Sequence, residues 1–98
     1  MISQLPDVIL FSKSNNWLYL IESVTSHGPV DGKRKLELEK IFNSKALSYI
    51  FVTAFNSREK MRSYLSDIAW ESEVWVSSDP SHLIHFNGDK FMGPFGNN

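Results

Sequence analysis

The chain contains no cysteine, which excludes disulfide bonds and thiolate metal sites. It has no apolar run near the roughly 20 residues that a membrane-spanning helix needs. No cleavage-like site follows its first apolar stretch, so we expect no secretory signal peptide. Repeats and linkers are missing as well. These absences predict one soluble cytoplasmic domain over residues 1–98, with a Gly/Asn-rich tail at 93–98 that frays.

The chain also lacks an excess of charge of either sign, because its net charge is −1. This is not the composition of a strongly basic DNA-binding domain. The charges are unevenly placed, however, since residues 33–62 carry eight lysines and arginines against three glutamates. Two interpretations stay open: this segment faces an anion, or it forms two solvated helix faces.

The apolar residues that are present follow two periods, one typical of strands and one of helices. We expect strands at 7–13, 17–24, 47–55, 72–77 and 82–86, and helices at 31–43 and 56–70. Asp31 is the expected N-cap of the first helix, and Asn56 with Glu59 suits a capping box for the second. We assign Trp70 and Trp75 to the apolar core. The order ββαβαβ(β) predicts an α/β fold with a mixed β-sheet flanked by helices.

Two acidic residues lie opposite each other if the first two strands form a hairpin. With Ser14-Asn15 as a two-residue turn, paired positions sum to 29, which places Asp7 opposite Glu22. Such side chains have Cβ atoms about 4.5–5.5 Å apart, so the like charges repel. A hard divalent cation such as Mg²⁺ relieves this repulsion, because it binds carboxylate oxygens. Alternatively, Asp7 lies at a wet strand end and Glu22 is solvated.

Three cations occupy the first turn of the first expected helix. Lys33, Arg34 and Lys35 there oppose the helix dipole, at a cost of about 0.3–1 kcal/mol each. An anion close to this turn would reverse the sign of the effect. The alternative is a solvated helix face with the surface pairs Lys33–Glu37 and Lys35–Glu39, worth about 0.2–0.5 kcal/mol each.

Several phrases of the sequence match one known family in order. They are LPDVILFSKSNNWLYLIESVTSHGPVDGKRKLELEKIF, YIFVTAF, SDIAWESEVWV and HLIHFNGDKFMGP, all within residues 5–95. In these phrases the chain resembles the C-terminal catalytic region of BsuBI/PstI-type type II restriction endonucleases. That family is placed in the PD-(D/E)XK nuclease superfamily, so the resemblance implies a restriction-endonuclease-like mixed β-sheet. The helix and strand that precede the Pro-Asp strand in superfamily cores are lacking from this catalytic-domain-like stretch.

The resemblance carries over to particular residues. Pro6-Asp7 matches the Pro-Asp of the superfamily motif, and Glu22 matches its second acidic residue. Val24 stands where the motif has lysine. The resemblance therefore implies that Asp7 and Glu22 are catalytic and hold Mg²⁺, which would polarise a phosphate and activate the attacking water.

The missing lysine needs a substitute, and the helix that follows supplies candidates. We expect Lys33 to take the catalytic role, with Arg34 as the second candidate. We also expect a Val24→Lys change to substitute for that cation in part. Lys35 and His27 complete the expected DNA-binding set.

The implied function is site-specific, metal-dependent hydrolysis of double-stranded DNA by a type II restriction enzyme. Cutting a palindromic duplex requires two active sites, so we expect a homodimer in the full-length enzyme. The alternative is a non-catalytic structural or interaction remnant that keeps the nuclease fold. Binding of Mg²⁺ or Mn²⁺ would discriminate the two, because a remnant need not retain it.

Overall fold

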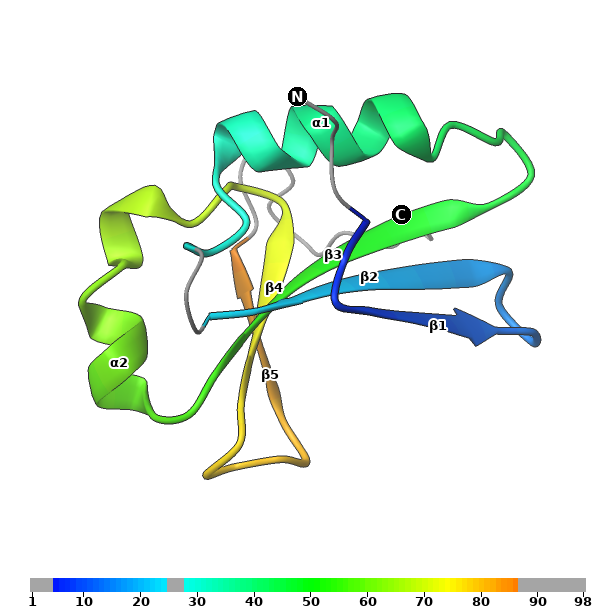
Figure 1. Ribbon diagram of the computed structural model, residues 1–98. Coiled ribbons are helices and arrows are strands. Elements are labelled where there is room, and N and C mark those ends of the chain that lie inside the picture. The colour runs from blue at the N-terminus through cyan, green and yellow to red at the C-terminus, as the bar shows by residue number, and fades with distance from the viewer. Residues whose placement is uncertain (1–4, 25–27, 87–98) are drawn as a thin grey trace.

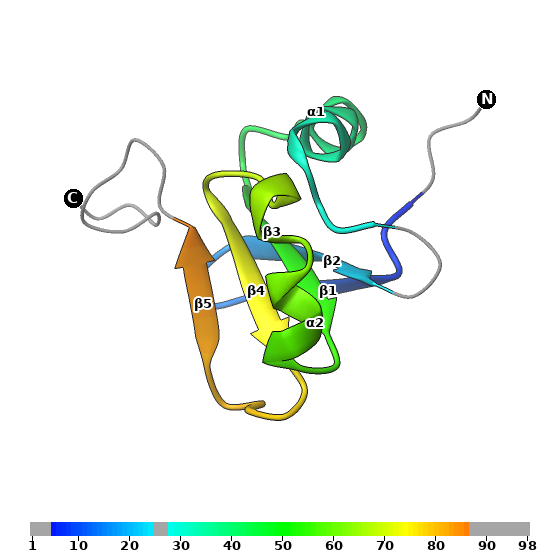
Figure 2. The ribbon, with the colours of Figure 1, turned by 90° about the vertical axis from the view of Figure 1, so that its left-hand side faces the viewer.

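The computed structural model of the chain describes residues 5–24 and 28–86 (Figure 1 and Figure 2). His27 and the tail at 93–98 lie outside the described residues. Within the described part of the chain, no helix is long and apolar enough to cross a membrane.

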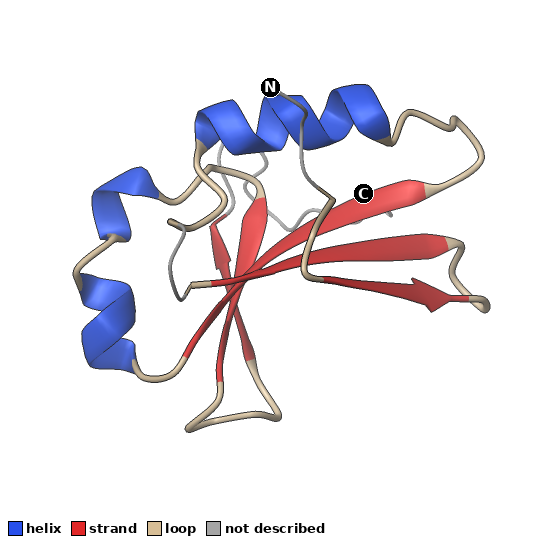
Figure 3. Cartoon of the chain, in the orientation of Figure 1, coloured by secondary structure: helices blue, strands red, loops and turns tan. Residues whose placement is uncertain are grey.

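One mixed β-sheet forms the centre of the fold (Figure 3). Its strands are β1 Val8–Ser12, β2 Trp17–Ser23, β3 Ser48–Phe55, β4 Ser72–Val76 and β5 Leu83–Phe86. The five strands lie in chain order across the sheet. The outer pairs are antiparallel, whereas β2, β3 and β4 run parallel. Figure 1 shows a strong twist, with β1 and β2 lying across β4 and β5. This arrangement confirms the predicted fold class and element order.

The first hairpin has the register that the sequence predicts. Val8 pairs with Ile21 and Ser12 pairs with Trp17, so paired positions sum to 29. The connection between the strands spans residues 13–16, and Asn16 takes a left-handed backbone conformation with φ 56°. Asparagine tolerates this conformation better than most residues. Asp7, the residue before β1, lies beside the end of β2, because its carboxylate accepts a hydrogen bond from the Ser23 N–H.

The helices follow the prediction at their starts more closely than at their ends. Helix α1 spans Gly32–Ile41 and begins at the expected N-cap, Asp31. The second predicted helix is wrong in length, because α2 covers only Arg58–Arg62 and a 3₁₀ turn at Leu65–Asp67 follows.

Two local contacts explain the short second helix. The N-cap is Ser57 and not Asn56: its hydroxyl accepts a hydrogen bond of 3.1 Å from the Lys60 N–H. At the other end, the N–H groups of Ser63 and Tyr64 donate to carbonyls three residues back. Such bonds tighten the chain into 3₁₀ geometry and stop the α-helix.

Both helices pack on one face of the sheet, over two apolar clusters. The cluster under α1 contains Leu20, Val30, Leu38 and Phe51. The cluster under α2 contains Val24, Phe55, Ile68, Val74 and Val76. Met61 of α2 and Tyr64, two residues after the helix, pack against the second cluster, as the helical period predicted. The end of β2 therefore lies between the two helices.

The expected core position of Trp70 is wrong, because this residue is 68% exposed. Ile68 and Ala69 fill the core just before it, and Glu71 turns the chain with φ 61°. The ring of Trp70 consequently lies outside, 6.2 Å from the ring of Phe86 between centroids. The edge strand β1 is also exposed: its four apolar residues keep 42% to 54% of their surface in contact with solvent.

Candidate functional site

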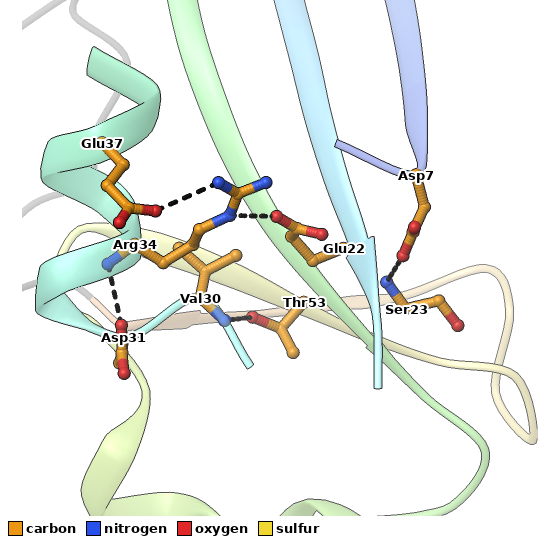
Figure 4. A network of polar contacts seen from close by, with 8 residues as sticks. All are labelled: Asp7, Glu22, Ser23, Val30, Asp31, Arg34, Glu37 and Thr53. Carbon is orange, nitrogen blue, oxygen red and sulfur yellow. Dashed lines mark hydrogen bonds and ion pairs between the residues drawn. The ribbon is translucent and has the colours of Figure 1, made fainter. Parts of the chain in front are cut away.

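An arginine from α1 contacts a glutamate near the end of β2. The guanidinium Nε of Arg34 donates to Glu22 Oε2, and its Nη1 lies 3.2 Å from Glu37 Oε1 (Figure 4). The side chains of Arg34 and Glu22 are only 17% and 12% exposed. Because little water reaches this pair, its electrostatic attraction is stronger than that of a solvated surface pair.

The segment that enters α1 is fixed by two hydrogen bonds. Asp31 Oδ1 accepts from the Arg34 N–H at 2.8 Å, which caps the helix. One residue earlier, the Val30 N–H donates to Thr53 Oγ1 on β3 at 3.0 Å. Val30 and Thr53 are fully buried, so this bond satisfies a donor that water cannot reach. Together these bonds hold the first turn of α1 beside the end of β2.

The second carboxylate of the predicted site comes from the residue before β1. Asp7 Oδ2 accepts a hydrogen bond of 2.8 Å from the Ser23 N–H at the end of β2. Figure 4 shows the Asp7 carboxylate turned toward Ser23, while the Glu22 carboxylate turns toward α1. Asp7, just before β1, is thus bonded to the residue that follows Glu22, and each of the two carboxylates is held by a different partner.

The donor set suits a hard divalent cation in its chemistry. Asp7 and Glu22 each use one oxygen in the contacts above, and each carboxylate has a second oxygen. Mg²⁺ commonly takes one or two carboxylates and completes its shell with water and phosphate oxygens. In the described residues no group of three or more acidic or histidine side chains forms a fuller metal cage. Among the described residues, Asp7 and Glu22 are therefore the two carboxylates that could hold a metal at this place.

The other predicted cations lie in different surroundings. Lys33 is exposed. Lys35 forms the expected surface pair with Glu39, at 3.2 Å, and its ammonium lies 5.2 Å from the centre of the Phe51 ring. Lys35 and Glu39 also line a cleft of about 380 Å³ between α1 and the 3₁₀ turn, which Arg34 and Glu22 do not line. The expected pair of Lys33 with Glu37 is replaced by the pair of Arg34 with Glu37.

A residue that sequence reasoning missed is Glu37, whose expected role was only that of a surface partner for Lys33. Its spacing of three residues from Arg34 places the two on one side of the helix. That spacing is the signal in the sequence that could have identified it.

A second acidic group lies on the opposite face of the sheet. Glu73 on β4 is 3% exposed, and its Oε2 contacts Nδ1 of His85, its direct partner on β5. Burial raises the pKa of the Glu73 carboxyl, and the nearby His85 partly opposes this rise. Glu73 pairs with Val52 on β3, and Val52 pairs with Ile21 on β2, so their three side chains lie on one face of the sheet. Successive residues of a strand point to opposite faces, so Glu22 lies on the other face.

Comparisons with known proteins agree with this fold. Residues 2–89 match the family model of the BsuBI/PstI restriction endonuclease domain. The chain is 55% identical over 92 residues to the type II restriction enzyme BsuBI of Bacillus subtilis, covering 94% of this chain and 29% of that protein. It is 32% identical over 87 residues to the type II restriction enzyme AplI of Arthrospira platensis, covering 89% of this chain and 27% of AplI.

One solved structure is similar over almost the whole chain. The structure of the SdaI restriction endonuclease matches with a TM-score of 0.84 and 44% sequence identity. The match covers 96% of this chain and 30% of the SdaI chain. The chain therefore spans less than a third of the length of each of these relatives.

Proposed function

The chain belongs to the BsuBI/PstI restriction endonuclease family, and we propose that it supplies the DNA-cleaving part of a type II restriction enzyme. The reaction is hydrolysis of a phosphodiester in double-stranded DNA at a specific site. The observation that carries this proposal is that the first hairpin brings the Asp7 carboxylate to the Ser23 N–H, next to Glu22, with the Arg34 guanidinium beside Glu22.

In this proposal Asp7 and Glu22 hold a divalent cation, which we take to be Mg²⁺. When bound, such a cation polarises the phosphate and lowers the pKa of the attacking water. Arg34 is the residue that takes the role of the motif lysine. Its guanidinium is always charged and can donate to phosphate oxygens while it keeps a carboxylate partner. Aimed at the phosphate, it stabilises negative charge that develops in the transition state.

Lys33, the first candidate from the sequence, is placed second in this proposal; it is exposed in the same turn. We propose that Lys33 and Lys35 contact the DNA backbone, with His27 from the preceding loop. Backbone contacts of this kind position a duplex without reading its sequence. Cleavage of both strands of a palindrome is the reason to propose a two-fold dimer for the full-length enzyme.

A non-catalytic remnant is the alternative, and one observation favours it. Arg34 and Ser23 already satisfy one oxygen each of Glu22 and Asp7, so the two acids can be stable without a metal.

Metal titration separates the two functions. We expect the wild-type chain to bind Mn²⁺ in calorimetry, and expect Asp7→Asn and Glu22→Gln each to weaken binding by at least about tenfold, since each removes one of two charged ligands. Asp67→Asn, which neutralises an exposed acid of the 3₁₀ turn, is the matched control. Equal binding by wild type and Asp7→Asn would remove the basis of the proposal and favour the remnant.

A further inference from the structure

Glu37 lies on α1, one turn beyond Arg34, and shares that arginine with Glu22. Arg34 Nη1 is 3.2 Å from Glu37 Oε1, while Arg34 Nε donates to Glu22. The Glu37 side chain is 38% exposed and that of Glu22 is 12% exposed. One guanidinium therefore joins a shielded carboxylate on the sheet to a more solvated carboxylate on the helix.

A divalent cation would change the balance of charge around this guanidinium. Arg34 pairs with the Glu22 carboxylate in the structure. A divalent cation bound by Glu22 would compete with Arg34 for that carboxylate. The cation and Arg34 would then repel each other across a poorly solvated space. A second carboxylate on Arg34 offsets this repulsion, because it leaves the guanidinium with an anionic partner when Glu22 turns away.

We propose that Glu37 is a positioning residue: it holds Arg34 next to the site when Glu22 binds a divalent cation. This inference rests on the proposed function and adds a residue that the family motif does not contain. Arg34 suits the task because its planar fork presents separate N–H donors. Glu37 can thus remain paired with Nη1 of Arg34 when Nε loses its hydrogen bond to Glu22. In this way Glu37 supports cation binding without coordinating the cation.

The same helix provides a matched control. Glu39 is also a glutamate of α1 in an ion pair, with Lys35 at 3.2 Å, and its side chain is 45% exposed. It lines the cleft on the other side of the helix. Glu37→Gln and Glu39→Gln remove the same charge from the same helix, so a general loss of negative charge should affect both equally.

The test is Mn²⁺ affinity by calorimetry across a double-mutant cycle. We expect Glu37→Gln to weaken binding at least about threefold more than Glu39→Gln does, since Glu37 pairs with Arg34 whereas Glu39 pairs with Lys35. Arg34→Gln should tighten binding, because it removes the competing cation. In the Arg34→Gln background, the extra loss caused by Glu37→Gln should disappear. Urea unfolding of each variant without metal verifies that it is folded.

Three results would overturn the proposal. Equal losses for Glu37→Gln and Glu39→Gln would make Glu37 an ordinary surface partner. A full loss that persists in the Arg34→Gln background would mean that Glu37 acts on the cation directly and not through Arg34. Both of these leave the Asp7–Glu22 metal site intact. Absence of Mn²⁺ binding to the wild-type chain, in contrast, would overturn this proposal and the proposed function together.

Discussion

At position 24, the family motif has lysine and this chain has valine. Val24 is 5% exposed and belongs to the apolar cluster under α2, together with Phe55 and Ile68. The described residues of that cluster are hydrophobic, so an ammonium group among them would have no carboxylate partner within the cluster. Burying an unpaired charge in this way is strongly unfavourable. This is consistent with the proposal that a cation of α1, and not the residue at position 24, supplies positive charge at the site.

We therefore predict that Val24→Lys lowers the free energy of unfolding by about 3 kcal/mol or more. This replaces the expectation from the sequence that a lysine here would substitute for the helix cation. Leu36→Lys is the control, because Leu36 is 61% exposed on α1 and its change should stay within about 0.5 kcal/mol. Urea denaturation measures both. Equal unfolding free energies for the two variants would contradict the burial of position 24.

Glu73 provides a pH-dependent test that also concerns a single residue. Burial raises the pKa of its carboxyl above the ordinary value of 4.5. The folded chain then binds the proton more tightly than the unfolded chain does. The pKa in the unfolded chain is near the ordinary value of 4.5, and the pKa in the folded chain is higher. Glu73 therefore makes the folded chain less stable as the pH rises from the first value through the second.

Glu73→Gln cannot ionise, so we predict that its unfolding free energy changes less with pH above about 4.5 than that of the wild type does. Thermal or urea unfolding at several pH values checks this. Glu59→Gln, on the exposed surface of α2, should follow the wild-type curve. Parallel curves for Glu73→Gln and the wild type would show that Glu73 does not titrate differently in the folded state.

Among the helices and strands, the site depends on how α1 is attached to the sheet. The helix begins after Val30, whose buried N–H donates to Thr53 Oγ1 on β3. Asp31 then caps the helix through the Arg34 N–H, and the Arg34 side chain returns to Glu22 on β2. The start of the helix is consequently tied to two neighbouring parallel strands, which sets the position of the guanidinium.

We predict that Thr53→Val speeds hydrogen exchange of the Val30 amide, because valine has nearly the same shape as threonine but no acceptor. The lost bond should also cost about 1–3 kcal/mol of stability. Thr53→Ser is the control, since it keeps the hydroxyl and should leave that amide protected. Exchange measured by NMR distinguishes the variants. An amide that stays protected in Thr53→Val would mean that another acceptor fixes the start of α1.

Taken as one molecule, these 98 residues correspond to less than a third of the relatives' length. Their net charge is −1, and the positive charge is concentrated in residues 33–62. Affinity for DNA that is independent of sequence comes mainly from phosphates neutralised by lysine and arginine. A surface with one basic segment therefore offers few such contacts.

We predict that the 98-residue chain alone cuts DNA poorly or not at all. Its binding to duplex DNA should be weak and should vanish as salt is raised from about 50 to 200 mM. A cleavage assay beside the full-length Bacillus subtilis relative, in the same buffer and with the same metal, measures the difference. Tight, site-specific cleavage by this chain alone would contradict the prediction.

Features that depend on local spacing follow from the order of the amino acids alone. The periods of apolar residues located the strands and the start of α1, and the short turn between the first two strands set their register. That register predicts Asp7 opposite Glu22, and the folded chain brings the Asp7 carboxylate to the Ser23 N–H, next to Glu22. The phrases that resemble the BsuBI/PstI family also indicated the correct family. Each of these features depends on neighbours in the chain, so distant contacts were not needed to predict them.

The identity of the cation at the site, in contrast, is a property of the folded chain. Lys33, Arg34 and Lys35 are consecutive, and successive side chains on a helix point about 100° apart. Which one faces Glu22 depends on how α1 is rotated over the sheet. The burial of Leu38 and the bond from Val30 to Thr53 set that rotation, and both involve strands distant in sequence. The same physical reason applies to Trp70, which is exposed because Ile68 fills the core before it.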